Sequence, residues 1–185
     1  MMRRPTWFCD VDGVINAVAK LDKTHYKSFP DWNIVEVNGY TITYAPEVVD
    51  FMNHMADRVT LKMLTTWKYD SITKLAPAIG LRTDLEVIDV PGSFSALSMS
   101  NDRENRWWKL NAIMDHINSP DTTDLIWADD DLGSYDRNYV KRMAEFEGLE
   151  VLLLTPHTGV ALTRDHINRI ESFVESFEKR NANLM

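Results

Sequence analysis

Short apolar runs alternate along this chain with segments whose apolar residues recur at helical spacing. The runs predict buried strands, and the helical spacing predicts helices that pack by one face. Strands that alternate with helices in this way indicate a mostly parallel sheet covered on both faces. The predicted fold class is therefore α/β, with a mostly parallel five-stranded sheet. The strands are expected at about 7–10, 58–66, 85–90, 124–129 and 150–155, and the helices at about 46–55, 70–79, 106–117, 136–147 and from 163 onward.

Residues 17–45 break this alternation, and we interpret them as an insertion that forms a small β-hairpin flap. From Val35 to Thr43, apolar and polar residues alternate around Asn38-Gly39, which is a strong short-range signal for a hairpin. Two arrangements remain open. The hairpin either lies beside the end of the first strand and holds aromatic rings over a site there, or it only extends the edge of the sheet. The rings are those of Tyr26, Phe29 and Trp32.

The length and composition are those of one globular domain that extends over residues 1–185. The chain has 185 residues, of which 44% are hydrophobic and 26% charged. Its net charge of −8 argues against non-specific binding to nucleic acid or to an anionic membrane, because such binding needs a basic surface. A local basic patch around an anionic substrate is compatible with this charge.

The single cysteine and the N-terminal residues predict a cytoplasmic protein. Cys9 has no second cysteine to pair with and lies in the first predicted strand, where we interpret it as a small buried hydrophobic residue. Arg3 and Arg4 precede an apolar stretch that meets Asp10 too soon for a signal peptide. No run approaches the roughly 20 apolar residues of a membrane span, so no membrane association is expected.

Two aspartates follow the first strand at a spacing of two residues. In the stretch FCDVDGVIN, the apolar run ends at Asp10, Asp12 comes next, and Gly13 turns the chain. Open α/β sheets build their binding sites at the carboxyl ends of strands. Two carboxylates held this close repel each other, and a divalent cation would neutralise them. The alternative is an ordinary polar turn at the end of a strand, where Asp and Gly are common.

This stretch resembles the first motif, hhhDxDGx, of the haloacid dehalogenase (HAD) superfamily. Most members of that family are Mg²⁺-dependent phosphatases and phosphotransferases. Three further features resemble the family's other motifs: Thr65 at the end of the second strand, Lys109 in RWWKLNAI, and Asp129-Asp130 in LIWADDDLG. All four occur in the family's order, at predicted strand ends or near a helix start, over about residues 10–160. The resemblance implies a Rossmann-like, HAD-like fold.

The resemblance also implies a reaction, which is phosphoryl transfer through a phosphoaspartate. Asp10 would be the nucleophile that attacks phosphorus, and Asp12 would protonate the leaving-group oxygen and later activate water. Gly13 would let the backbone approach the phosphate closely. Thr65 would donate a hydrogen bond to a phosphoryl oxygen, the alternative being a hydroxyl that caps the next helix. Lys109 would neutralise the charge of the nucleophile and phosphoryl group, although a lone lysine on a helix is usually a solvated surface residue.

The metal implied by the resemblance is Mg²⁺, held by aspartates from two strand ends. Asp10 and the backbone carbonyl of Asp12 would bind it from the first motif. If the fourth strand ends at the alanine before the aspartates, the second pair is Asp129-Asp130. Asp130 would then contact Mg²⁺, and Asp129 would support the motif lysine or a metal-bound water. The alternatives are the pair Asp130-Asp131, or a solvated acidic loop with no metal.

Other residues near these motifs are candidates for substrate binding or for replacing the motif lysine. Thr66 and Trp67 follow the second strand, where Trp67 could stack on a nucleobase. The serine-rich stretch 92–104 predicts a loop. At its end, Arg103 and the nearby Arg106 offer alternative cations.

The short gaps between the motifs leave no room for a large cap domain. By family resemblance, a nearly capless site suits a large phosphorylated substrate, or needs a second copy of the chain to close it. Trp67 and the segment 156–163 resemble small HAD-like proteins of actinobacteria and their phages. The expected function is that of a Mg²⁺-dependent phosphomonoesterase. The alternatives are a nucleotide or polynucleotide-end phosphatase, and a HAD-fold binding protein without turnover.

Overall fold

A computed structural model of the chain describes residues 3–89 and 102–182 and confirms the α/β fold class. One sheet contains β1 (Thr6–Cys9), β4 (Thr60–Met63), β5 (Glu86–Val87), β6 (Leu125–Ala128) and β7 (Val151–Leu154). Its five strands are parallel and lie in the order β5-β4-β1-β6-β7, so the first strand is central. Cys9 pairs with Met63 on one side and with Ala128 on the other. β1, β4 and β6 therefore end at one level, and the residues that follow them meet at one edge.

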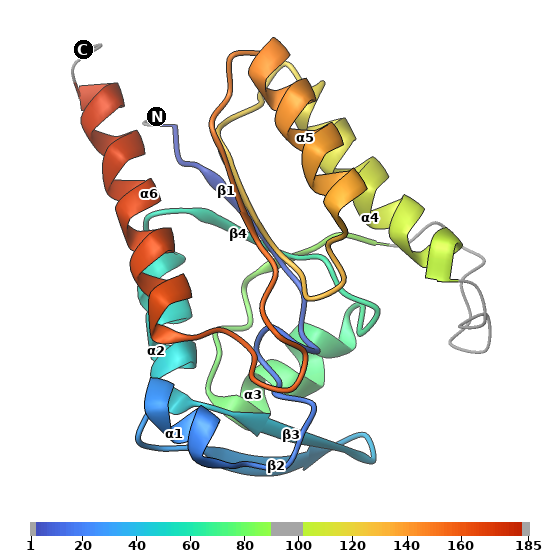
Figure 1. Ribbon diagram of the computed structural model, residues 1–185, viewed down its shortest axis with the longest axis vertical. Coiled ribbons are helices and arrows are strands. Elements are labelled where there is room, and N and C mark those ends of the chain that lie inside the picture. The colour runs from blue at the N-terminus through green and yellow to red at the C-terminus, as the bar shows by residue number, and fades with distance from the viewer. Residues whose placement is uncertain (1–2, 90–101, 183–185) are drawn as a thin grey trace.

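Helices cover both faces of this sheet, as the alternating pattern predicted (Figure 1). They are α2 (Pro46–Met55), α4 (Asp102–Ile117), α5 (Ser134–Phe146) and α6 (Arg164–Ala182). α2 and α6 lie on one face, and α4 and α5 on the other. In β1, Trp7 and Cys9 belong to the core on the α2 and α6 side, whereas Phe8 belongs to the core on the α4 and α5 side. Burial on both faces explains why the strand is a continuous apolar run.

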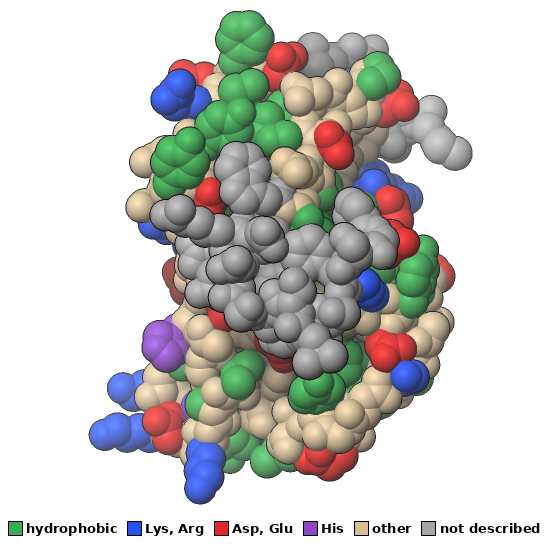
Figure 2. All heavy atoms as spheres, turned by 90° about the vertical axis from the view of Figure 1, so that its right-hand side faces the viewer, with side chains coloured by type: hydrophobic (Ala, Val, Ile, Leu, Met, Phe, Trp, Pro, Cys, Tyr) green, Lys and Arg blue, Asp and Glu red, His purple; other side chains and the backbone are tan. Residues whose placement is uncertain are grey.

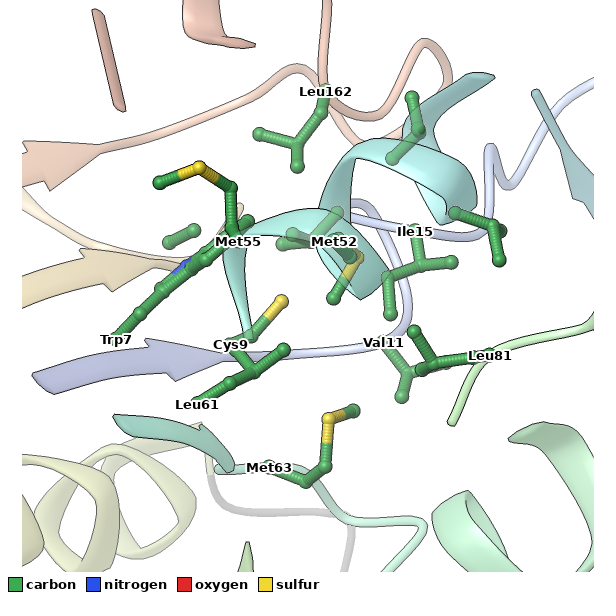
Figure 3. Close-up of a cluster of buried hydrophobic side chains, with 14 of the residues drawn as sticks. Trp7, Cys9, Val11, Ile15, Met52, Met55, Leu61, Met63, Leu81 and Leu162 are labelled. Atoms are coloured by element: carbon green, nitrogen blue, oxygen red, sulfur yellow. The ribbon is translucent and has the colours of Figure 1, made fainter. Parts of the chain in front are cut away.

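The core between β1 and α2 is rich in methionine and aliphatic side chains (Figure 3). Met52 and Met55 of α2 are fully buried in the same cluster as Trp7 and Cys9. Burying one such side chain stabilises the fold by about 1.5–3 kcal/mol, so this layer anchors the strand that precedes the two aspartates. Burial, and then the nearby Asp10, raises the pKa of the Cys9 thiol well above its usual value. Cys9 is thus a neutral core residue, as predicted.

The predicted hairpin forms from β2 (Asn33–Val37) and β3 (Tyr40–Tyr44). Asn38 and Gly39 between them have φ of 55° and 80°, the left-handed conformation that a tight two-residue hairpin turn requires. The two strands form a sheet of their own. The arrangement in which this hairpin extends the edge of the main sheet is therefore wrong.

The segment before the hairpin contains a helix that the apolar pattern did not predict. This helix, α1 (Lys23–Ser28), begins with a capping box in which Asp22 and His25 exchange hydrogen bonds with each other's backbone. Phe29 is buried, and its ring packs 6.2 Å from that of Trp32, while Tyr26 is exposed. Phe29 and the partly buried Trp32 therefore pack into the main core rather than standing free.

Two other elements differ from the predicted pattern. The helix expected at 70–79 is a π-helical turn, η1 (Ser71–Leu75), followed by α3 (Ala76–Ile79). Pro77 explains the break, because it lacks an N–H and its ring collides with a normal helical carbonyl; the Ala76 N–H instead reaches back to the Ser71 carbonyl. Of the third predicted strand, 85–90, only Glu86 and Val87 form β5 among the described residues, and position 90 lies outside them. Of the serine-rich stretch 92–104, residues 92–101 lie outside the described residues, and 102–104 begin α4.

Hydrophobic side chains gather on the upper part of the face that α4 and α5 present (Figure 2). On α5, Tyr135 and Phe146 are among the exposed large hydrophobic residues, and the ring of Tyr135 stacks on that of Tyr139.

Across the described ranges of the chain, no helix combines the length and the apolar character needed to cross a membrane.

Candidate active site at the carboxyl edge of the sheet

The candidate site begins where β1 and β6 end side by side. Asp10 follows β1, and its N–H donates to the Ala128 carbonyl at 3.1 Å. Asp129 follows β6, and its N–H donates to the Leu154 carbonyl at 3.1 Å. The backbone ladder of the sheet thus continues one residue past each strand and fixes both aspartates. From β1 the chain builds one half of the sheet and later returns on the other side, so this edge lies where the strand order reverses.

Lys109 of α4 joins the two aspartates. Its Nζ donates to Asp10 Oδ2 at 2.5 Å and to Asp129 Oδ2 at 2.7 Å. All three side chains are largely buried, with 13%, 11% and 2% exposed for the lysine, Asp10 and Asp129. A charge buried this deeply must be paired, and here one ammonium group is paired with two carboxylates. Lys109 is therefore not the solvated surface lysine that was the alternative.

The pKa values of these groups reflect the competition between burial and pairing. Burial disfavours the charge on Lys109, but Asp10 and Asp129 outweigh it and raise the pKa of the ammonium group above its usual value. Burial raises the pKa of Asp129 to about 6, and Lys109 opposes that shift. Lys109 consequently keeps its charge, while the raised pKa means that Asp129 binds a proton more readily than a solvated aspartate does.

A third carboxylate completes an acidic cluster. Asp10, Asp129 and Asp130 each offer a carboxylate oxygen, and these oxygens lie within 4.8 Å of one another. Asp130 also accepts a hydrogen bond from Thr158 Oγ1 at 2.6 Å. Burial raises the pKa of Asp130, and the Thr158 hydrogen bond opposes the shift. Hard oxygen donors at this spacing have the chemistry that a divalent cation such as Mg²⁺ prefers.

Only two of the three consecutive aspartates belong to the acidic cluster. β6 ends at Ala128, and Asp129 and Asp130 both belong to the cluster. Asp131 is exposed, and its contribution is a backbone N–H that donates to Asp129 Oδ1 at 3.0 Å. Within the described part of the chain, the acidic pair at this edge is thus Asp129 and Asp130.

Asp130 approaches the backbone of Gly13 so closely that only glycine fits at this position. Its φ is 71°, in the left-handed region that favours glycine. A Cβ built on Gly13 would lie 2.3 Å from both Cγ and Oδ2 of Asp130, much closer than real carbon atoms approach. The absent side chain therefore makes room for Asp130 beside the first motif, in addition to the approach to phosphate that the resemblance implies.

The side chain of Asp12 lies outside the acidic cluster. Asn16 Nδ2 donates to its Oδ1 at 2.7 Å, and Trp67 Nε1 donates to its Oδ2 at 2.9 Å. The resemblance implies that Asp12 binds the metal through its backbone carbonyl only. In agreement with that, its carboxylate is not part of the acidic cluster. Two neutral N–H donors hold it instead.

The residues after β4 reach the same edge. The Leu64 N–H donates to the Cys9 carbonyl at 2.9 Å, which places Thr65 level with the aspartates. Thr65 is fully buried, and its Oγ1 accepts a hydrogen bond from the Trp67 N–H at 3.3 Å. Because η1 begins only at Ser71, that hydroxyl closes a local turn and does not cap a helix. Thr66 is exposed.

Two participants were not predicted as site residues. Asn16 belongs to the quoted first motif, four residues after Asp12. That short spacing was the only sign in the sequence that its side chain could reach Asp12. Thr158 lies in the loop after β7, where no local pattern marks it. The side chains of Arg103 and Arg106, offered as alternatives to Lys109, lie outside the described part of the structure.

Comparisons of the chain with protein-family models, curated proteins and solved structures gave no match. A function for this chain therefore has to be inferred from the chemistry of these residues.

Proposed function

We propose that this protein is a HAD-like, Mg²⁺-dependent phosphomonoesterase that acts through a phosphoaspartate on Asp10. The observation that carries the proposal is the double hydrogen bond of Lys109 to Asp10 and Asp129. These three residues come from three separate motif-like segments, and they converge although Asp10 and Lys109 are 99 positions apart. A polar turn, a surface lysine and a solvated acidic loop would have no reason to meet in a buried cluster.

The residues present fit the reaction in two balanced steps. In the first, a carboxylate oxygen of Asp10 attacks phosphorus, the bond from phosphorus to the ester oxygen breaks, and Asp12 gives its proton to that oxygen, releasing an alcohol. In the second, water attacks the phosphoaspartate and gives a proton to Asp12. The bond from phosphorus to Asp10 then breaks, and phosphate leaves. Lys109 offsets negative charge beside Asp10 in both steps.

The same edge fits a divalent cation. Asp10 and Asp130 would hold Mg²⁺, as the resemblance implies, and both contribute a carboxylate oxygen to the acidic cluster. When bound, Mg²⁺ would supply positive charge opposite the phosphoryl oxygens. Asp129 would keep Lys109 directed at Asp10.

Phosphate release from a panel of phosphomonoesters with Mg²⁺ tests this proposal. We expect release by the wild type, loss of release with a chelator, and a loss of at least about a thousandfold in Asp10→Asn, which keeps the shape of the side chain but lacks the nucleophilic carboxylate. Asp131→Asn is the matched control and should retain activity, because Asp131 lies outside the cluster. A wild type that binds Mg²⁺ but releases phosphate from no ester would favour a HAD-fold binding protein, and an Asp10→Asn variant with normal activity would overturn the nucleophile.

A further inference from the structure

Both oxygens of the Asp12 carboxylate accept hydrogen bonds from side chains, one in the same motif and one in the segment after β4. Asn16 Nδ2 lies 2.7 Å from Oδ1, and Trp67 Nε1 lies 2.9 Å from Oδ2. A carboxylate bound at one oxygen can still rotate about its χ2 bond, whereas one bound at both oxygens is fixed in direction. The plane of the Asp12 carboxylate is thus set by two groups that the reaction scheme does not use.

The orientation of Asn16 is itself determined by the hairpin. The amide N–H of Thr43 in β3 donates to Asn16 Oδ1 at 2.8 Å. Since an N–H must meet an oxygen, the amide oxygen of Asn16 faces Thr43 and its NH₂ group faces Asp12. Asn16 is buried, with 4% of its surface exposed, so it has no competing contact with bulk water.

Trp67 is held from the same strand. The ring of Tyr40 in β3 packs edge-on against the Trp67 indole, with 5.5 Å between centroids and 62° between planes. The hairpin turn is also tied to the segment after Trp67, because Asn38 Nδ2 donates to Asp70 Oδ2 at 2.9 Å. Both donors to Asp12 therefore contact β3 and are held by it.

We infer that Trp67 and Asn16 are positioning residues for Asp12, and that β3 holds them in place. This inference depends on the proposed function, in which Asp12 transfers protons. Proton transfer requires the donor and acceptor atoms within hydrogen-bond reach, and a supporting shell loose by about 1 Å is enough to impair a site. Stacking of Trp67 on a nucleobase stays a prediction; the contact seen here is made by its polar edge, which donates to Asp12.

A positioning role predicts a dependence on the leaving group. An alkyl phosphate expels a basic alkoxide and needs the proton from Asp12, whereas 4-nitrophenyl phosphate expels a stable phenolate and needs it far less. The ratio kcat/KM reports only the steps up to formation of the phosphoaspartate. Loss of the Trp67 donor should therefore lower kcat/KM mainly for the alkyl ester.

The experiment compares wild type and Trp67→Phe on 2-phosphoglycerol and 4-nitrophenyl phosphate, with Mg²⁺ at constant pH. Trp67→Phe removes the N–H and keeps a ring against Tyr40. We expect kcat/KM to fall at least about tenfold more for the alkyl ester, since general acid–base catalysis contributes about 10²–10⁴-fold. Trp67→His should recover part of the loss, because its Nε2 lies as many bonds from the backbone as the indole nitrogen.

Trp7→Phe is the matched control, because its indole N–H has no acceptor among the described residues. It should leave the ratio between the two esters unchanged. An equal loss of kcat/KM on both esters in Trp67→Phe would overturn the positioning role, since a general structural defect gives that result.

A second readout does not depend on turnover. The six tryptophans give six indole N–H signals in a ¹H–¹⁵N spectrum, and the signal lost in Trp67→Phe identifies Trp67. In Asp12→Ala, this signal should move more than the other five, and an unmoved signal would contradict the contact. If the wild type released phosphate from neither ester nor from any other ester of the panel, the proposed function would be overturned, and the positioning role with it. The indole signal would still report whether Trp67 binds Asp12.

Discussion

Replacing Lys109 with methionine removes the cation that Asp10 and Asp129 share, while a chain of similar length remains. The two carboxylates then have oxygens within 4.8 Å and no partner between them. At that separation two unit charges repel by about 3.5 kcal/mol with an effective dielectric constant of ~20. Breaking a buried ion pair by removing one partner costs about 3–5 kcal/mol. We expect Lys109→Met to lower the free energy of unfolding by about 3 kcal/mol at pH 8, which corresponds to a fall in Tm of roughly 6–12 °C for a chain of this size.

The loss should depend on pH with a defined sign. In the folded wild type, burial already raises the pKa of Asp129 to about 6, and the loss of Lys109 raises it further. In the unfolded chain the same carboxyl group has its ordinary pKa near 3.9. Between about pH 6 and its own higher pKa, the folded variant binds a proton that the folded wild type does not. The penalty is therefore full above the variant's pKa, shrinks as the pH falls through it, and levels off below about pH 6. At pH 5, we expect less than half of the loss seen at pH 8.

Urea unfolding followed by tryptophan fluorescence, with a chelator present, measures both values. Lys62→Met is the matched control, because Lys62 forms a partly exposed pair with Glu86 across β4 and β5, at 2.9 Å. Exposed pairs contribute about 0–1 kcal/mol, so that variant should lose less than about 1 kcal/mol at either pH. A Lys109→Met variant as stable as wild type at pH 8, or one with the same loss at both pH values, would refute the electrostatic reasoning.

Two further predictions concern the acidic cluster. Gly13→Ala places a Cβ 2.3 Å from Asp130 Cγ, whereas Gly39→Ala, at a similar positive φ, meets nothing within 4 Å. Both variants should lose roughly 1–2 kcal/mol of unfolding free energy to left-handed strain. By urea unfolding, Gly13→Ala should lose at least about 1 kcal/mol more than Gly39→Ala. Asp130→Asn should weaken Mg²⁺ binding at least about tenfold by calorimetry, and Asp131→Asn should leave it unchanged. Equal costs for the two glycine variants, or equal Mg²⁺ affinities for the two asparagine variants, would count against the cluster as described.

The sequence determined the layers of this fold because its signals are local. A strand buried on both faces must be apolar throughout, so β1, β6 and β7 were visible as runs, and the Asn38-Gly39 turn was visible because few other pairs adopt two left-handed residues in succession. The candidate chemistry followed in part from the same patterns. Asp10 and Asp129 each stand directly after an apolar run, and the parallel topology brings such positions to one edge.

Only the tertiary structure decided which of these residues belong to the acidic cluster and which side chains contact them. Strand register sets Asp129 and Asp130, not Asp131, in the cluster, and no local pattern encodes a one-residue choice within three identical side chains. The short helix α1 depends on a capping box and leaves no apolar period long enough to detect. The segment 70–79 was predicted as a helix, but its π-helical turn depends on Pro77. The two donors to Asp12 come from 4 and 55 positions away and are held by β3. Contacts of that kind exist only once the hairpin has folded back onto the carboxyl edge of the sheet.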